Sequence, residues 1–288
     1  MVAEEGKIRE FARATKSACP AHIRGRDPVP PVTFLASSQL WMAPENSPWR
    51  GIQRDFRYVL HGEQEFRFHG PPLAAGTRLR AHQAIERTYD KRGQRGGKMT
   101  FTEVVTRFTA EDTEDSLVVM RALSIQREPT RPGGAAQGGG AQASGRPTKP
   151  IAQGAAALEA APGEGLPWLD HTEPPLTVTD FVGYQGASGD FNPIHHDTEF
   201  ARAAGQPGPF AVGMLTASIA ANLVSAKFGP DAVRRYRVRW HGKAWPGDAL
   251  RYCGIQARDG SQVTLTVSRP DGAPHLTAWA ELIKPGGD

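Results

Sequence analysis

The sequence predicts an α+β fold in which an antiparallel sheet wraps a helix, and it predicts that this unit is built twice. Three observations support the prediction. Segments that alternate apolar and polar residues are separated by Asp-Gly turns, one long uncharged run has helical spacing, and two motifs recur in both halves at nearly one offset. The apolar face of such a sheet must be buried against another element, and an apolar helix must be surrounded by other elements, so the two are expected to pack together.

The composition is that of a soluble globular protein. The 288 residues are 39% hydrophobic and 22% charged, which suffices for two domains with buried cores. A net charge of +4 is too small to predict nucleic-acid binding. The uncharged run at 203–226 contains Gly, Pro and several polar residues, so it predicts a buried helix and no membrane partner.

Two cysteines, Cys19 and Cys253, have no metal-site spacing and form no disulfide framework. The first fourteen residues lack the apolar core of a signal peptide. We therefore expect a cytoplasmic location, with neither a metal ion nor a cofactor.

A change of composition divides the chain. Residues 129–167 are mainly Gly, Ala, Pro and Gln with few large apolar side chains, and such a segment cannot bury a core. The sequence thus predicts a first domain over 1–128, a flexible linker over 129–167 and a second domain over 168–288.

The two halves are related to each other. The stretch FARATKSACPAH at 11–22 aligns with YQGASGDFNPIH at 184–195, and FRFHGPPLAAGTRL at 66–79 resembles VRWHGKAWPGDAL at 238–250. From His22 to His69 is 47 residues and from His195 to His241 is 46. Two matches at nearly one offset indicate a duplicated unit.

Each half shows strands. In the second half they are expected at 235–241, 249–257, 261–269 and 275–283, with Asp-Gly turns before the last two. Segments 78–91, 98–110 and 116–128 take these parts in the first half.

The predicted helices differ between the halves. From about 210, five large apolar residues recur at helical spacing, namely Met214, Leu215, Ile219, Leu223 and Val224. Between His22 and Leu60 the first half has five prolines and no such period. The first domain should therefore have a shortened or broken central helix.

The segment SGDFNPIHHD holds the candidate chemistry. Asp190 and His195 lie five residues apart on a stretch that Pro193 keeps irregular, so both side chains can point at one water and move protons. Alternatively, Asp190 caps a helix and Asn192 forms an Asx-turn. A metal site made by His195, His196 and Asp197 is disfavoured, because adjacent histidines seldom converge on one ion.

This motif, with GMLTAS at 213–218 and WPGDAL at 245–250, resembles the MaoC-like (R)-specific enoyl-CoA hydratases and 3-hydroxyacyl-ACP dehydratases. The first half resembles the dehydratase-like domain that precedes it in two-domain members. The resemblance implies a double hot-dog fold, with the two halves paired as an internal pseudo-dimer. Either a monomer of this kind or a homodimer of two such chains is compatible with it.

The resemblance also implies site residues. Asp190 and His195 fall on the catalytic pair, Asn192 supports them, and the N–H of Gly213 points at the thioester carbonyl. Val212 stands where the family has His, and with Met214 it is expected at the substrate.

The first half departs further from the family pattern. It keeps His22 but has Ser17 opposite Asp190 and Cys19 opposite Asn192. We therefore expect a non-catalytic first half that makes room for a long or bulky acyl chain.

The implied activity is the reversible hydration of trans-2-enoyl thioesters carried by CoA or acyl carrier protein. Two other functions remain open, a hot-dog thioesterase and a non-catalytic acyl-thioester-binding protein. Arg235, Arg237, Arg239 and His241 form a basic stripe near Lys243, read either as a solvated strand face or as a contact for carrier phosphates.

Overall fold

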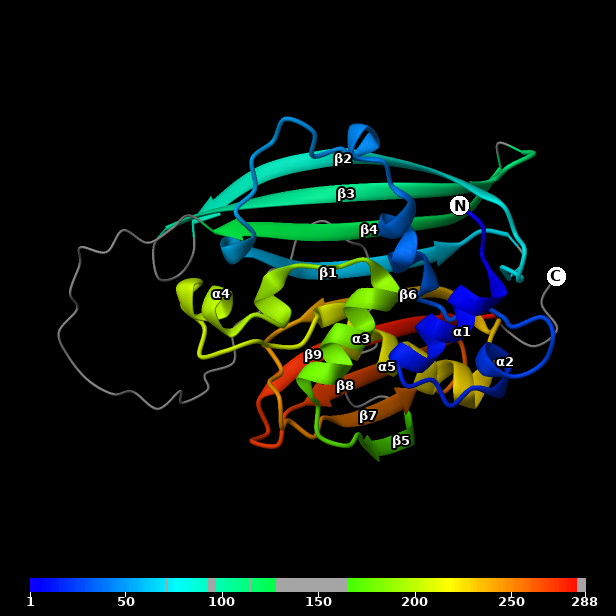
Figure 1. Ribbon diagram of the computed structural model, residues 1–288. Helices are drawn as coiled ribbons and strands as arrows, with labels where there is room; N and C mark the ends of the chain where they lie inside the picture. Colours follow the sequence, from blue (N-terminus) through cyan, green and yellow to red (C-terminus); the bar gives the residue numbers. More distant parts are fainter. Residues whose placement is uncertain (71, 93–96, 114, 128–164, 284–288) are drawn as a thin grey trace.

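One antiparallel sheet carries both halves of the chain. The computed structural model describes residues 1–70, 72–92, 97–113, 115–127 and 165–283, and its nine strands follow the order β2-β3-β4-β1-β6-β9-β8-β7-β5 (Figure 1). The first-half strands are β1 (Val59–Phe68), β2 (Leu79–Arg92), β3 (Lys98–Ala110) and β4 (Ser116–Arg127). The second-half strands are β5 (Leu166–Thr172), β6 (Val233–Trp240), β7 (Arg251–Gln256), β8 (Gln262–Ser268) and β9 (Pro274–Leu282).

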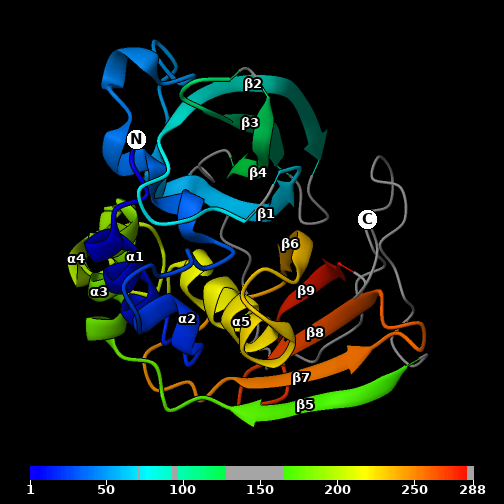
Figure 2. The ribbon, with the colours of Figure 1, turned by 90° about the vertical axis from the view of Figure 1, so that its right-hand side faces the viewer.

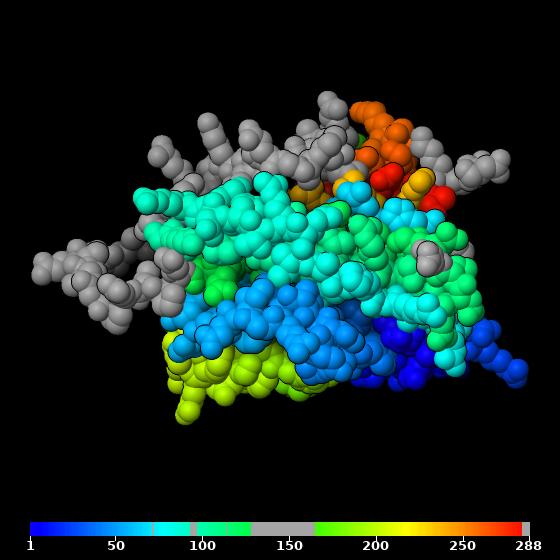
Figure 3. Space-filling model, turned by 90° about the horizontal axis from the view of Figure 1, so that it is seen from above, coloured from blue at the N-terminus to red at the C-terminus, as the bar shows by residue number. Residues whose placement is uncertain are grey.

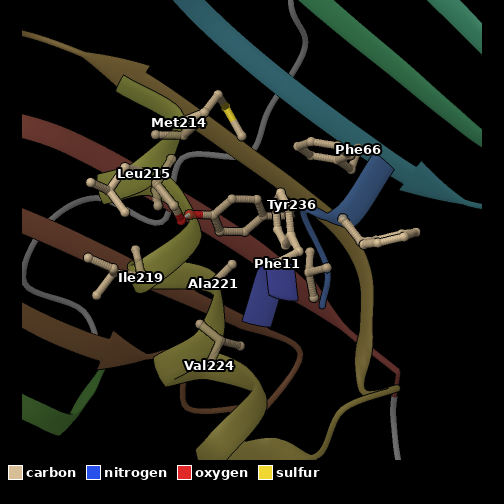
Figure 4. Packing of buried hydrophobic residues seen from close by; sticks show 14 of the residues in the cluster. Phe11, Phe66, Met214, Leu215, Ile219, Ala221, Val224 and Tyr236 are labelled. Carbon is tan, nitrogen blue, oxygen red and sulfur yellow. Dashed lines mark hydrogen bonds between the residues drawn. The ribbon is translucent and has the colours of Figure 1, made fainter. Parts of the chain in front are cut away.

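The second-half strands wrap a long helix, as the sequence predicts. Helix α5 (Gly213–Phe228) lies in the hollow of β5–β9 (Figure 2). Its side chains are buried almost all round, which is why its sequence carries little polar periodicity. Figure 4 shows Leu215, Ile219 and Val224 on this helix, and the hydroxyl of Tyr236 on β6 donates to the Ala217 carbonyl at 2.7 Å.

The first half has no counterpart of α5 within residues 24–58. That region holds three 3-10 helices, η1 (Phe34–Trp41), η2 (Pro44–Asn46) and η3 (Phe56–Tyr58). The expected broken central helix is confirmed, and the prolines explain it because each removes a backbone donor. Seen from above, the segment ahead of β1 lies between the first-half strands and the short helix α4 (Thr198–Ala203) (Figure 3).

The halves join symmetrically along β1 and β6. Glu65 lies opposite Arg237, with Phe66 opposite Tyr236 and Gln64 opposite Val238 on either side. Helix α1 (Glu5–Ala14) packs on α3 (Val178–Ser188) in the same manner, since the Phe11 and Tyr184 rings lie 5.9 Å apart. The sequence alignment pairs Phe11 with Tyr184, so equivalent residues meet across the seam, as a pseudo-dimer of duplicated units requires.

The basic stripe on β6 is neutralised by the first half. Arg235 binds Glu65, while Arg237 and Arg239 both bind Glu63, and these side chains are 10–28% exposed. The structure therefore supports neither expectation for these arginines, since they are not a solvated face and their charge is not free for a phosphate. The nearby His241 ring instead contacts the Thr277 hydroxyl through Nε2 at 2.9 Å.

Several elements lie outside the expected ones. Strand β5 begins at Leu166, two residues inside the stretch expected as linker, whereas 128–164 lie outside the described residues. Strand β1 and helices α1, α2 (Pro20–Ile23) and α3 were not expected as such. Within the described part of the chain, no helix is long and apolar enough to cross a membrane.

We predict that Glu65→Gln lowers the free energy of unfolding by about 3 kcal/mol, because it leaves the largely buried Arg235 without its carboxylate. Burial alone would raise the pKa of Glu65, but the hydrogen bonds of Arg235 and Arg67 outweigh it and lower that pKa, so the stabilisation is present above pH 4.5 and fades on acidification. Urea unfolding measures the change.

Glu86→Gln is the matched control, because the Glu86–Arg121 pair also joins two strands but is well exposed. It should change stability by less than about 0.5 kcal/mol. Equal effects at the two positions would contradict the role given to the seam.

Candidate active site

Helix α3 delivers the candidate turn to its place. The helix begins with a capping box, in which Thr177 and Asp180 satisfy each other's backbone N–H groups. It ends at Gly189, whose φ of 81° is left-handed. A Cβ at Gly189 would also lie 2.9 Å from Leu40, so both the backbone conformation and the close packing require glycine here. The chain therefore leaves the helix sharply, with Asp190 as the next residue.

Local hydrogen bonds hold the turn. The Asn192 side chain accepts from the Ile194 N–H at 3.2 Å, which is the Asx-turn that the sequence offered as an alternative. The Asp190 carboxylate accepts one N–H, from Asn192 at 3.4 Å. The Gln185 amide donates to the carbonyls of Asp190 and Asn192 at 2.8 and 3.0 Å. Capping thus occupies only part of the Asp190 carboxylate, so it does not compete with an acid–base role.

His195 is buried in a defined tautomer. It ends the 3-10 helix η4 (Pro193–His195) and is 8% exposed. Its Nδ1 lies 2.8 Å from the Phe210 carbonyl, which can only accept, so Nδ1 carries the proton and Nε2 keeps a lone pair. Burial lowers the pKa of His195, against the opposing effect of the Asp190 charge. A neutral imidazole with a free basic nitrogen results.

The negative charge of Asp190 acts on His195, although no direct ion pair joins the two side chains. The Asp190 charge acts on His195 and on the buried hydroxyl of Tyr184, where it adds to burial in raising the pKa. Among the described ion pairs none joins Asp190 directly to His195. Two groups that are coupled but not bonded can hold a water between them and exchange protons with it.

Helix α5 begins beside this pair. Phe210, which holds His195, precedes the first helical residue, Gly213, by three positions. Val212 at the N-cap provides no side-chain acceptor. The N–H groups of Gly213 and Met214 have no hydrogen-bond partner among the residues that the structure describes. A helix start with free N–H groups favours negative charge nearby.

A tryptophan explains the glycine at the helix start. Trp240 Nε1 donates to the Gly213 carbonyl at 3.1 Å, and a Cβ on Gly213 would lie 3.0 Å from the indole ring. Gly213 is therefore required by close packing. The side chains of Val212 and Met214 are 2% and 6% exposed and belong to the core, where Figure 4 shows Met214.

The corresponding turn of the first half is closed. Ser17 Oγ lies 2.8 Å from His22 Nδ1, so these two side chains are hydrogen-bonded directly to each other, unlike Asp190 and His195. Both are buried, and burial lowers the pKa of His22 to about 4. His22 Nε2 has no partner, and a ring without exposed surface cannot meet a substrate. This geometry fits the expected non-catalytic first half.

An apolar pocket of about 60 Å³ lies at the opposite end of α5. Residues 29–35, the end of β1 and the start of β6 line it, including Val29, Phe34, Phe68 and Val233. Pro230 and Asp231, just after the C-terminal end of α5, also line it. Its lining includes no residue of the Asp190 turn, and it occupies the first half where a central helix is missing.

Sequence reasoning missed the residues that orient this turn. Gln185 is a buried polar residue one helical turn before Gly189, and its position in an apolar face is the signal that was available. The Phe210 carbonyl and Trp240 act through contacts that spacing does not reveal. No group of three or more His, Cys, Asp or Glu among the described residues is placed to hold a metal ion.

Each half of the chain matches a known protein family. A model of the MaoC-like domain matches residues 164–264, and a model of the FAS1-like dehydratase domain region matches residues 1–120. Together they cover most of the described chain, one in each half, with residues 121–163 between them.

Two curated relatives are similar over much of the chain. The peroxisomal enoyl-CoA hydratase 2 of Arabidopsis thaliana is 26% identical over 239 residues, which cover 80% of this chain and 70% of that protein. The peroxisomal hydratase-dehydrogenase-epimerase of Neurospora crassa is 26% identical over 192 residues, or 67% of this chain. This match spans only 19% of the Neurospora protein.

Solved structures share the fold. A MaoC-like dehydratase superposes with a TM-score of 0.74 at 22% identity, covering 99% of this chain and 95% of that one. A Mycobacterium tuberculosis protein described as a double hot-dog superposes with a TM-score of 0.59 at 13% identity, covering 98% and 93%. The predicted double hot-dog fold is confirmed.

We predict that Gly213→Ala lowers the free energy of unfolding by about 1–3 kcal/mol, because the new methyl group meets a rigid indole at 3.0 Å. Urea unfolding followed by circular dichroism measures it. Gly183→Ala is the control, since Gly183 lies within α3 with no atom within 4 Å of an added Cβ, and it should stabilise the fold by about 0.5–1 kcal/mol. A neutral Gly213→Ala variant would show that the helix start tolerates a side chain.

Proposed function

Because the chain belongs to the MaoC-like dehydratases, in the two-domain form with a FAS1-like dehydratase region first, we propose that it reversibly hydrates trans-2-enoyl thioesters to (R)-3-hydroxyacyl thioesters. One observation carries the proposal. A buried, neutral imidazole lies within the field of the Asp190 carboxylate, and the helix start that follows its Phe210 contact has N–H groups without partners among the described residues.

The geometry supports a stepwise assignment of roles. Asp190 and His195 Nε2 hold the water, and this pair takes a proton from it as its oxygen bonds to C3 of the enoyl group. Negative charge then builds on the thioester oxygen, where the Gly213 N–H donates to it. The pair returns a proton to C2, so the product gains one hydroxyl and one hydrogen. Dehydration is the reverse, and neither direction uses a cofactor.

The shape of the first half supports a long or bulky acyl chain. Residues 24–58 supply no α-helix to fill the hollow of β1–β4, and an apolar pocket remains there. The pocket reaches Pro230, beyond the end of α5 that is remote from Gly213, and this position fits a long acyl chain better than a short one. Turnover confined to short enoyl thioesters would contradict this part of the proposal.

Lys243 replaces the β6 arginines as the candidate contact for carrier phosphates. Its ammonium lies 4.7 Å from the centre of the Phe210 ring, which also packs on His195 at 5.1 Å. Lys243 donates to Gln206 and, among the described ion pairs, has no carboxylate partner. A cation at this place serves the phosphates of CoA and of phosphopantetheine alike, so both carriers belong to the proposal.

We predict that Asp190→Asn and His195→Gln each lower kcat by roughly 10²-fold or more, because each removes one proton-transferring group. The assay follows the loss of conjugated enoyl-thioester absorbance, together with thiol release, over a series of acyl lengths on both carriers. Thiol release would instead indicate a thioesterase, and neither signal a binding protein.

Asp197→Asn is the matched control for these variants. Asp197 lies in the same motif, but its carboxylate caps α4 by accepting from the Phe200 N–H at 2.9 Å, and asparagine caps a helix equally well. This variant should keep wild-type turnover. Full activity in either Asp190→Asn or His195→Gln would overturn the assignment of roles.

We predict that the acid limb of the pH profile of kcat/KM lies below pH 6.5. Burial lowers the pKa of His195 from its ordinary 6.5, and the base form is the active one, so activity falls only as the pH drops through this lowered value. Initial rates from pH 4.5 to 8 on one enoyl thioester measure it. An acid limb above pH 6.5 would contradict a buried, neutral His195.

A further inference from the structure

A bulge in β1 brings a first-half histidine to the site. Along the β1–β4 pairing His61 lies opposite Ser124 and Glu63 opposite Leu123, so Gly62 is an extra residue. A Cβ on Gly62 would lie 2.8 Å from Ile125, which explains the glycine. Bulges re-aim neighbouring side chains and recur beside active sites. Because β1 pairs with β6 only from Glu63 onward, His61 lies just beyond the seam, at the Trp240 end of β6.

His61 packs on the indole that braces α5. The rings of His61 and Trp240 lie 4.6 Å apart at 39°, and Trp240 donates to the Gly213 carbonyl. One aromatic ring therefore separates a first-half imidazole from the helix start that faces the thioester in the proposed reaction. The same imidazole lies within the field of Asp190, whose negative charge favours its protonated form.

His61 is accessible and at the same time desolvated. Its side chain is exposed, yet burial by the surrounding protein lowers its pKa to about 4. The charge of Asp190 opposes this shift, as do hydrogen bonds with the Glu63 backbone and the Gln64 side chain. Because the pKa is low, the ring is neutral at neutral pH.

We infer that His61 is a third polar side chain of the active site, contributed by the otherwise non-catalytic first half and directed at the water or 3-hydroxyl oxygen near Asp190. The inference rests on the proposed function. It gives the first half a direct part in the reaction, because a neutral imidazole opposite His195 fixes the oxygen whose proton the Asp190–His195 pair moves. His61 thus holds this oxygen without itself exchanging a net proton.

Steady-state kinetics with an enoyl-CoA test the inference. His61→Ala should lower kcat by roughly tenfold or more with little change in KM, whereas His61→Gln, which keeps a donor and an acceptor, should retain most of the turnover. His69→Ala is the control, because His69 is exposed just after the same strand. Wild-type kcat in His61→Ala, or equal losses in the Ala and Gln variants, would overturn the inference.

A second measurement places His61 without relying on turnover. Neutral, accessible imidazoles react with diethyl pyrocarbonate, and mass spectrometry reports the site. We expect octanoyl-CoA, a saturated thioester, to protect His61 and to leave His69 unchanged. Unprotected His61 in a chain that hydrates enoyl-CoA would overturn the inference alone. Protected His61 in a chain without hydratase activity would overturn the proposed reaction, yet keep His61 in the thioester site.

Discussion

The pairing of β1 with β6 is the constraint on which the rest of the structure depends. It joins the four strands of the first half and the five strands of the second half into one sheet. The register of this pairing is centred on Glu65 opposite Arg237. The carboxylates of Glu63 and Glu65 form ion pairs with three arginines that would otherwise repel one another along one strand. Charges held this way contribute less to net stability than to registry, because the cost of desolvation offsets much of their attraction. The registry then decides which first-half residues reach the second half.

The start of α5 also depends on β6, because the last residue of that strand, Trp240, contacts it. A buried helix normally satisfies its first N–H groups with a capping side chain, but Val212 cannot accept a hydrogen bond. Trp240, at the end of β6, holds the Gly213 carbonyl and leaves the N–H groups free. A helix of 16 residues stabilises the fold enough through its apolar contacts to tolerate an uncapped end. The unsatisfied donors stay available for an oxyanion.

Local patterns predicted the parts of the fold that depend on neighbours in sequence. The apolar period over 213–228 and the turns before β8 and β9 needed no distant partner to be recognised. The arginines of β6 were misread because their partners, Glu63 and Glu65, lie on a strand of the other half, and alternation does not show what lies across a pairing. The catalytic roles of Asp190 and His195 remain a prediction. The structure shows which hydrogen bonds hold this turn, through Gln185 and the Phe210 carbonyl. His61 had no signal in sequence, because a single extra residue in β1 aims it.

The two duplicated turns differ in ways that favour chemistry in the second half alone. Ser17 and His22 keep the hydrogen-bonding distance of a polar pair, so replacing the carboxylate did not disturb the turn itself. What the first half lacks is a long helix whose start faces the pair, since residues 24–58 form only 3-10 segments. A carboxylate restored at that turn would still find no helical N–H groups for a developing oxyanion and no accessible ring beside it. Without such a helix, an acid at the first-half turn would have no oxyanion donors to work with. His61, on β1 of the same half, is the residue that we infer to contribute to the second-half site instead.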